Sequence, residues 1–111
     1  MVKEVIRPWG RFKEFVKNKK CTVKILEIKP KQELSLQYHK KREEMWYFLD
    51  KAVVQLGKRK IKVNGGNIIK IPKKRPHRII SESNKIRVLE ISLGNFKEGD
   101  EIRLEDDYGR K

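Results

Sequence analysis

The stretch LSLQYHKKREEMW, residues 34–46, decides the fold of this 111-residue chain. Its first six residues alternate between apolar and polar side chains, as a β-strand with one buried face does. The polar face carries Ser35, Gln37 and His39. Four polar residues then separate His39 from Glu44, which is enough for a short turn that returns the chain as a second strand. An amide, an imidazole and a carboxylate can therefore converge on one point.

The second histidine of the chain lies in the stretch NIIKIPKKRPHRII, residues 67–80. His77 follows a strand-like run and a turn marked by two prolines. Both histidines therefore occupy strand contexts in which they can face each other. A histidine beside Gln and Glu in a basic chain is more often part of a solvated strand edge. The spacing alone thus leaves a set of metal ligands and a solvated edge both open.

Together the two stretches resemble the paired motifs of the cupin superfamily, G-x5-H-x-H-x(3,4)-E-x6-G and G-x5-P-x-G-x2-H-x3-N. The spacing of the ligand positions matches throughout, with Gln37 in the place of the first histidine. Lysine stands at three positions that are usually glycine, and serine stands for the final asparagine; these residues are Lys31, Lys51, Lys74 and Ser81. Because glycine is favoured where the backbone needs a positive φ, the lysines predict turns of another type or modest strain.

Five separated motifs, in the same order, resemble the type II phosphomannose isomerase family. They are RPWG at 7–10, LSLQ at 34–37, R-x-E at 42–44 followed by Trp46, IP…HR at 71–78 and EDDYGR at 105–110. In many bacteria that family forms the C-terminal domain of a bifunctional enzyme that also carries a mannose-1-phosphate guanylyltransferase domain. A stretch of 111 residues has room for the isomerase domain alone.

The resemblance implies a metal site. The Gln-x-His…Glu…His pattern is similar to the zinc site of phosphomannose isomerases, and it assigns the ligands Gln37, His39, Glu44 and His77. Nitrogen and oxygen ligands suit a divalent cation; we expect Zn²⁺, while Mn, Fe, Co and Ni stay open. The activity that the family implies interconverts mannose 6-phosphate and fructose 6-phosphate, through an enediol whose negative charge a cation stabilises.

This isomerisation also moves a proton between C2 and C1 of the sugar, so the site needs a base. Glu44 is occupied if it binds a metal, and the candidates in the neighbouring turn are Lys41 and Glu43, between which the sequence does not decide. Lys40, Lys41 and Met45 stand where the family often has histidine. These departures keep a second function open, a cupin that binds a metal and a sugar phosphate or other small anion without catalysis.

Four residues are candidates for holding the substrate, namely Ser35, Arg78, Tyr108 and Arg110. Ser35 lies on the polar strand face and can bond a sugar hydroxyl, and the guanidinium groups of Arg78 and Arg110 match a phosphate. Strand alternation turns Arg78 away from His77, so a surface arginine is an equal interpretation. By charge alone, the acidic segment that contains Tyr108 would be a solvated tail; the resemblance implies that it returns toward the site.

The remainder of the chain predicts short strands separated by turns, without a long amphipathic helix. The strands are expected at 21–29, 34–39, 45–49, 52–56, 60–63, 68–71, 78–81 and 86–93. Such a pattern indicates an all-β sandwich or barrel, and the resemblance selects the cupin double-stranded β-helix, a jelly-roll barrel. We expect a single domain over residues 1–111, in which residues 1–20 form an arm packed on the barrel and residues 95–111 return toward the site.

Basic residues dominate the charge of the chain. Lys and Arg number 29 against 15 Asp and Glu, which gives a formal net charge of +14. Because these residues are spread from end to end without a nucleic-acid-binding motif, we expect no nucleic-acid partner. The excess suits a phosphorylated sugar as substrate, and the mixture of Lys, Arg and Glu also resembles the surface of proteins from hot environments.

Three features bear on location and assembly. Cys21 is the single cysteine, so no intramolecular disulfide can form and the chain suits a reducing compartment. The N-terminal stretch lacks the apolar core of a signal peptide, and no run of about 18 apolar residues is present, so we expect a cytoplasmic protein without a membrane partner. The apolar face of Leu34, Leu36 and Tyr38 is expected to point outward and to need a cover, either the N-terminal arm or a second subunit, and we expect a homodimer.

Overall fold

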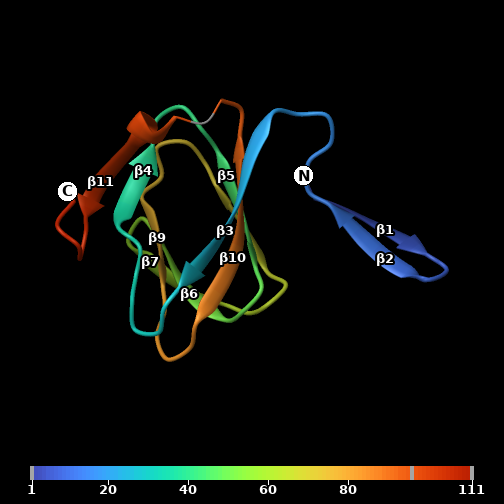
Figure 1. The fold of residues 1–111 in the computed structure, drawn as a ribbon, viewed down its shortest axis with the longest axis horizontal. Helices are drawn as coiled ribbons and strands as arrows, with labels where there is room; N and C mark the ends of the chain where they lie inside the picture. Colours follow the sequence, from blue (N-terminus) through green and yellow to red (C-terminus); the bar gives the residue numbers. More distant parts are fainter. Residues whose placement is uncertain (1, 96, 111) are drawn as a thin grey trace.

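The computed structural model describes residues 2–95 and 97–110, and the described part of the chain is almost entirely β-structure (Figure 1). The strands are β1 (Lys3–Arg7), β2 (Gly10–Glu14), β3 (Cys21–Ile28), β4 (Leu36–His39), β5 (Glu44–Phe48), β6 (Ala52–Leu56), β7 (Arg59–Val63), β8 (Ile68–Ile71), β9 (His77–Ile80), β10 (Ile86–Leu93) and β11 (Glu101–Glu105). One turn of 3₁₀ helix, η1 (Glu98–Asp100), precedes β11. The predicted all-β class is confirmed.

Two antiparallel sheets face each other and form the barrel (Figure 1). The first has the strand order β3-β10-β5-β8, and the second has the order β11-β4-β9-β6-β7. Strands that are distant in sequence are therefore neighbours in space, as in a jelly roll. The predicted cupin double-stranded β-helix is confirmed, and the eight strands expected from the sequence lie within two residues of the observed ones.

The apolar core fills the space between the two sheets. Its buried members are Ile28, Trp46, Phe48, Val54, Val63, Ile71, Ile79, Ile86 and Val88. Leu34 precedes β4 and packs against this core, so the expectation that it points outward is wrong. Leu36, expected on the same outer face, is only 8% exposed. Little of the predicted outer apolar face is therefore left to cover.

The strand register turns a second set of side chains, mostly polar, toward the interior. In the first sheet, Ser92 lies opposite Glu44 and Glu90 lies opposite Trp46. In the second sheet, Gln37 lies opposite His77. Paired residues share a face of the sheet, and every second residue of each strand points the same way. The polar side chains therefore gather at the end of the barrel where β5 begins.

The first strands, β1 and β2, form a hairpin that extends away from the barrel (Figure 1). Ile6 is 76% exposed and Trp9, at the turn, is 74% exposed. Contact with the barrel occurs at the base of the hairpin, where the ring of Phe15 lies 5.2 Å from that of Tyr47. Lys13 of β2 also places its Nζ 5.3 Å from the centre of the Tyr47 ring. Residues 1–20 therefore contact the barrel at the base of the hairpin, while the turn of the hairpin extends away from it.

The C-terminal segment adds β11 to the edge of the second sheet, beside β4. Glu101 lies opposite His39 and Arg103 lies opposite Gln37. Asp100, just before this strand, accepts hydrogen bonds from the backbone N–H groups of Lys40 and Lys41 at 3.0 Å. Residues 97–105 therefore lie against the end of the barrel that carries the polar side chains.

Two of the lysines at glycine positions have the left-handed backbone that glycine favours. Lys31 has a φ of 61° and Lys74 a φ of 66°, which costs an ordinary residue about 1 kcal/mol or more. Lys51 is not among the residues of positive φ. The strain predicted from the motif is therefore present at two of the three positions.

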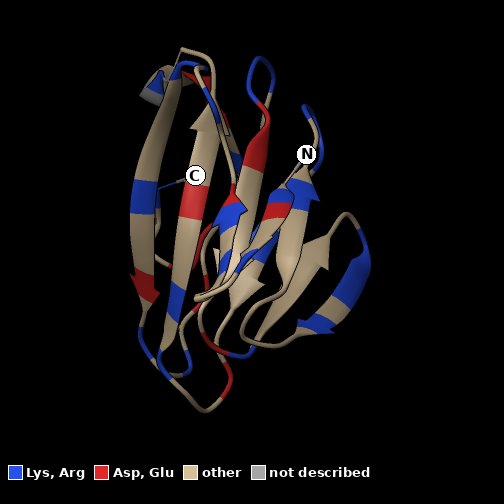
Figure 2. Cartoon of the chain, turned by 90° about the vertical axis from the view of Figure 1, so that its right-hand side faces the viewer, with Lys and Arg blue, Asp and Glu red and all other residues tan. Residues whose placement is uncertain are grey.

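Lys and Arg are scattered over strands and loops, with Asp and Glu among them (Figure 2). Arg87 pairs with Asp50 at 3.2 Å, and Lys85 lies 3.9 Å from Glu27. Among the described residues, none belongs to a helix long and apolar enough to span a membrane.

Candidate metal centre

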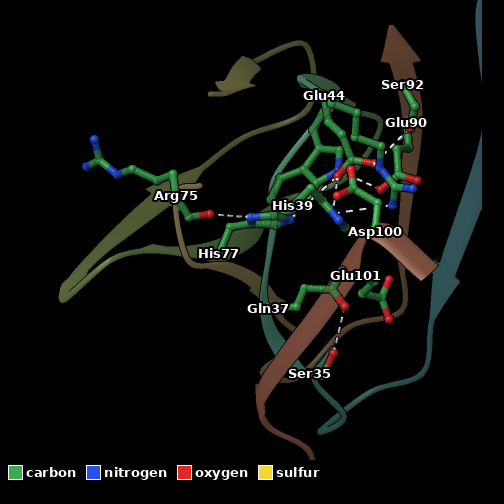
Figure 3. Close-up of polar contacts among 12 residues, drawn as sticks. Ser35, Gln37, His39, Glu44, Arg75, His77, Glu90, Ser92, Asp100 and Glu101 are labelled. Carbon is green, nitrogen blue, oxygen red and sulfur yellow. Dashed lines mark hydrogen bonds and ion pairs between the residues drawn. The ribbon is translucent and has the colours of Figure 1, made fainter. Parts of the chain in front are cut away.

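Three buried side chains from three strands converge at the polar end of the barrel (Figure 3). His39 ends β4, Glu44 begins β5 and His77 begins β9. One ligand atom from each of them lies within 4.8 Å of the others. Their exposed fractions are 2%, 3% and 0%. Three of the four metal ligands expected from the sequence are thus brought together.

The hydrogen bonds of His77 set its tautomer. Nδ1 lies 2.7 Å from the backbone carbonyl of Arg75, so Nδ1 carries a proton and donates it to that carbonyl. Nε2 therefore turns a lone pair toward Glu44 Oε1, which lies 3.5 Å away. Although it is buried, Nε2 has no hydrogen-bond partner among the described residues. Metal-binding histidines typically donate the N–H of the other ring nitrogen to a backbone carbonyl, which fixes the tautomer in this way.

The same carboxylate oxygen also faces the other imidazole. His39 Nε2 lies 3.1 Å from Glu44 Oε1, and the two imidazole rings have centroids 5.0 Å apart. Lone pairs gathered in a buried space repel one another unless a positive charge lies among them, from a bound proton or a metal ion. Two imidazoles and one carboxylate are also the ligands of known catalytic zinc sites, which leave a position open for water or substrate. The cluster therefore fits a divalent cation.

Two neighbours orient Glu44 from behind. Ser92 Oγ donates to Glu44 Oε2 at 2.8 Å, and the guanidinium Nε of Arg42 lies 3.3 Å from the same oxygen. Burial raises the pKa of the Glu44 carboxyl, but the contacts with His39 and Ser92 outweigh this effect, so the pKa lies well below its usual range. Oε2 is held by the protein while the ionised Oε1 is directed at the two histidines.

Arg42 is a site residue that the sequence analysis placed in a polar turn. Its side chain is only 4% exposed, and it donates from Nη1 to the backbone carbonyl of Lys97 at 3.2 Å. Its Nη2 lies 3.4 Å from His39 Nε2. The resemblance already marked this position through the R-x-E motif, which was the available signal. Arg42 links the turn, the Glu44 carboxylate and the C-terminal segment.

Gln37, the fourth expected ligand, lies opposite His77 in the pairing of β4 with β9, but its amide is directed to other groups (Figure 3). The amide lies 2.8 Å from Ser35 Oγ. With the amide nitrogen facing Ser35, Gln37 donates to Ser35 Oγ and, at 3.1 Å, to the carboxylate of Glu101. Ser35 is 3% exposed, and its hydroxyl is hydrogen-bonded to the Gln37 amide. A ligand role for Gln37 stays a prediction.

A cavity of about 230 Å³ opens beside the cluster. It is lined by Lys24, Leu26, Leu34, Ser35, Gln37, Glu90, Glu101, Arg103 and Arg110. Arg103 pairs with Glu101 at 2.7 Å, and Arg110 pairs with Asp106 at 3.0 Å. Three basic side chains at one cavity give a small anionic ligand several donors.

The other candidates from the sequence lie elsewhere. Lys41 and Glu43 are exposed in the loop between β4 and β5. Arg78 points away from His77, as alternation requires, but it is 6% exposed, because it pairs with Glu33 at 3.3 Å and donates to the carbonyl of Leu34 at 3.0 Å. Tyr108 is 53% exposed and donates to the side chain of Gln32.

The comparisons with known proteins place the chain in a family. Residues 1–106 match the family described as mannose-6-phosphate isomerase C-terminal. The chain belongs to this family. It is 32% identical over 120 residues to the mannose-1-phosphate guanylyltransferase ManC of Salmonella typhimurium, covering 99% of this chain and 24% of the relative. It is also 32% identical over 110 residues to the alginate biosynthesis protein AlgA of Pseudomonas aeruginosa, covering 96% of this chain and 23% of that protein.

The chain thus spans about a quarter of the length of these curated relatives. Among solved structures, the capsular polysaccharide assembling protein CapF of Staphylococcus aureus superposes with a TM-score of 0.71 at 19% identity, over 95% of this chain and 34% of that one. A protein described as a putative sugar phosphate isomerase from Acidithiobacillus ferrooxidans superposes with a TM-score of 0.62 at 19% identity, over 68% of this chain and 51% of that one. At these identities the structures show a shared fold.

Proposed function

We propose that this chain is a metal-dependent aldose-ketose isomerase that interconverts mannose 6-phosphate and fructose 6-phosphate. The observation that carries the proposal is the buried cluster of His39, Glu44 and His77, whose ligand atoms lie within 4.8 Å of one another. The cavity beside it is lined by three basic and two acidic side chains among others. Membership of the mannose-6-phosphate isomerase C-terminal family supports the choice of substrate.

The roles follow from the chemistry of each group. His39, Glu44 and His77 would hold the cation, for which Zn²⁺ is our first choice because borderline nitrogen and oxygen donors suit it. When bound, a divalent cation stabilises the negative charge that develops on the sugar oxygens. Arg103 and Arg110, at the cavity, attract the phosphate group, since a guanidinium matches phosphate oxygens.

We also propose a cytoplasmic homodimer. The exposed hairpin is the main support, because a two-stranded hairpin alone in water is only marginally stable and needs a further surface. Val23 and Ile25, on the edge strand β3, are 55% and 60% exposed and offer an apolar surface on the barrel. Light scattering is expected to give twice the 13.3 kDa chain mass, and Trp9→Ser is expected to give the monomer; a monomeric wild type refutes the dimer.

The isomerase proposal is tested by incubating metal-loaded protein with mannose 6-phosphate in deuterated water. We expect fructose 6-phosphate to form and deuterium to enter at the exchangeable carbon, because the proton moves between C2 and C1. His39→Ala and His77→Ala are expected to abolish both signals. Lys58→Ala, at an exposed turn, is the matched truncation control and should leave both unchanged.

The second function kept open by the sequence is separated by the same experiment. A wild-type protein that binds the metal and the sugar phosphate but shows neither product nor deuterium entry is a binding cupin and contradicts the isomerase proposal. Activity that survives both histidine substitutions would contradict the assignment of the metal centre.

A further inference from the structure

Glu90 is a buried acid that the roles described so far leave without a task. It lies in the middle of β10 and is 8% exposed, in contrast to the exposed Lys41 and Glu43 that the sequence suggested as bases. It lines the cavity beside the metal centre, together with the basic side chains of Lys24 and Arg103. A buried carboxyl that faces a cavity is costly to maintain for packing alone.

The strand register fixes the place of Glu90 relative to the metal centre. In the pairing of β10 with β5, Ser92 lies opposite Glu44 and Glu90 lies opposite Trp46. Glu90 is therefore one interior position away from Glu44, a step of about 7 Å along the strand. Figure 3 shows Glu90 and Ser92 on the same strand beside Glu44. A sugar whose oxygens bound at the metal centre would therefore bring its first two carbons to the side of the site on which Glu90 lies.

Trp46 holds one carboxylate oxygen of Glu90 in position. The indole Nε1 donates to Glu90 Oε2 at 3.0 Å, and the same indole packs edge-on against His77, with ring centroids 5.3 Å apart. One rigid side chain therefore spans the distance between the acid and a metal ligand. This arrangement fixes the orientation of the carboxyl group toward the site.

We propose, resting on the isomerase function above, that Glu90 is the base that carries the proton between C2 and C1 of the open-chain sugar. A Glu90 carboxylate oxygen takes the proton from C2, and the electron pair of the broken C2–H bond forms the C1=C2 double bond. The O1 oxygen takes up the negative charge of the former carbonyl bond, and the O2 hydroxyl proton passes to O1. The Glu90 acid then returns its proton to C1 while O2 becomes the ketone oxygen.

The surroundings of Glu90 suit this proton transfer. Burial raises the pKa of the Glu90 carboxyl, and the nearby Glu44 carboxylate raises it further, whereas the hydrogen bond from Trp46 and the charges of Lys24 and Arg42 lower it. The net direction is upward, which makes the carboxylate a stronger base than an exposed glutamate. These charged groups lie on both sides of β10: Lys24 belongs to β3, Glu44 to β5 and Arg42 to the loop before β5.

Glu90→Gln is the variant that tests the proposal, because the amide oxygen still accepts the Trp46 hydrogen bond while the group can no longer take a proton. We expect kcat to fall by about 10²- to 10⁴-fold, deuterium entry into the sugar to fall with it, and KM to change little. Zinc content and the binding of mannitol 6-phosphate, which has no carbonyl to react, should equal those of wild type. Glu27→Gln removes the same charge from the exposed face of β3 and is the matched control.

The outcomes separate the base from the isomerase. An active wild type with an equally active Glu90→Gln overturns the base assignment and leaves the isomerase intact, and a wild type without turnover or exchange overturns both. A Glu90→Gln that loses zinc or mannitol 6-phosphate binding assigns Glu90 a structural role and also overturns the proposal. If Glu90→Gln does not fold, Glu90→Asp decides: a slowed but measurable deuterium entry supports the base, and unchanged kcat refutes it.

Discussion

Binding of a divalent cation should stabilise the fold through the His39, Glu44 and His77 cluster. The three side chains are at most 3% exposed and already converge in the folded chain, whereas in the unfolded chain His77 is distant from the other two. The cation therefore binds the native state in preference to the unfolded one. At a free metal concentration 100 times the Kd, the linkage amounts to about 2.7 kcal/mol. For a domain of this size that corresponds to a rise in Tm of roughly 10 °C.

The assay is thermal unfolding followed by circular dichroism, first with a chelator and then with Zn²⁺, Mn²⁺, Co²⁺ or Ni²⁺ in molar excess. His77→Gln retains a side chain of similar polarity but loses the imidazole, so its Tm should not respond to the metal. Lys58→Gln introduces the same residue at an exposed turn and should keep the full response. An unchanged wild-type Tm with all four ions, or a rise that persists in His77→Gln, refutes the reasoning.

Three further predictions concern single residues. Trp46→Phe keeps an aromatic ring but leaves buried Glu90 without its indole donor, and urea unfolding should show a loss of about 1–3 kcal/mol. The side-chain hydrogen bond from Arg110 lowers the pKa of Asp106 to about 2. The stabilisation of the folded state by this pair is present above the unfolded pKa of Asp106 and is lost as the pH falls toward 2. An NMR titration of Asp106 should find its midpoint near 2 in wild type and near the ordinary value in Arg110→Gln. Lys74→Gly relieves a positive φ of 66° and should raise the unfolding free energy by up to about 1 kcal/mol.

The strands of the barrel were predictable because their interior and exterior residues differ in polarity. In β10, for example, Val88 is buried and Arg87 is exposed; their partners in β3 are the half-buried Leu26 and the exposed Glu27. The two strands of the N-terminal hairpin and β11 were not predicted. Their residues are mostly charged, and neither face of the hairpin is buried, so the alternation that marks a strand is missing. Pro8, which has no backbone N–H to donate, lies in the turn between β1 and β2.

The metal cluster was predictable for a different reason. Spacing alone left a solvated strand edge open, but the resemblance to the cupin motifs assigned His39, Glu44 and His77 as ligands, and the structure brings these three together. Glu90 could not be inferred in this way, because a charged residue in a strand is usually solvated, and the R-x-E motif marked Arg42 without indicating that its side chain is buried. Only the packing of the C-terminal segment over Arg42, and of Trp46 against Glu90, makes these two residues part of the site.

The separation between the metal centre and the proposed base is set by the pairing of β5 with β10. Glu44 and Trp46 are neighbours on one face of β5, and their partners Ser92 and Glu90 are neighbours on the same face of β10. Each residue of one pair bonds its partner through the side chain, Ser92 to Glu44 and Trp46 to Glu90. A one-residue slip of β10 against β5 would turn Glu90 and Ser92 to the outer face. The ladder between β5 and β10 thus holds the proposed cation ligand and the proposed base at a fixed distance, as the proposed isomerisation requires because both groups would act on adjacent carbons.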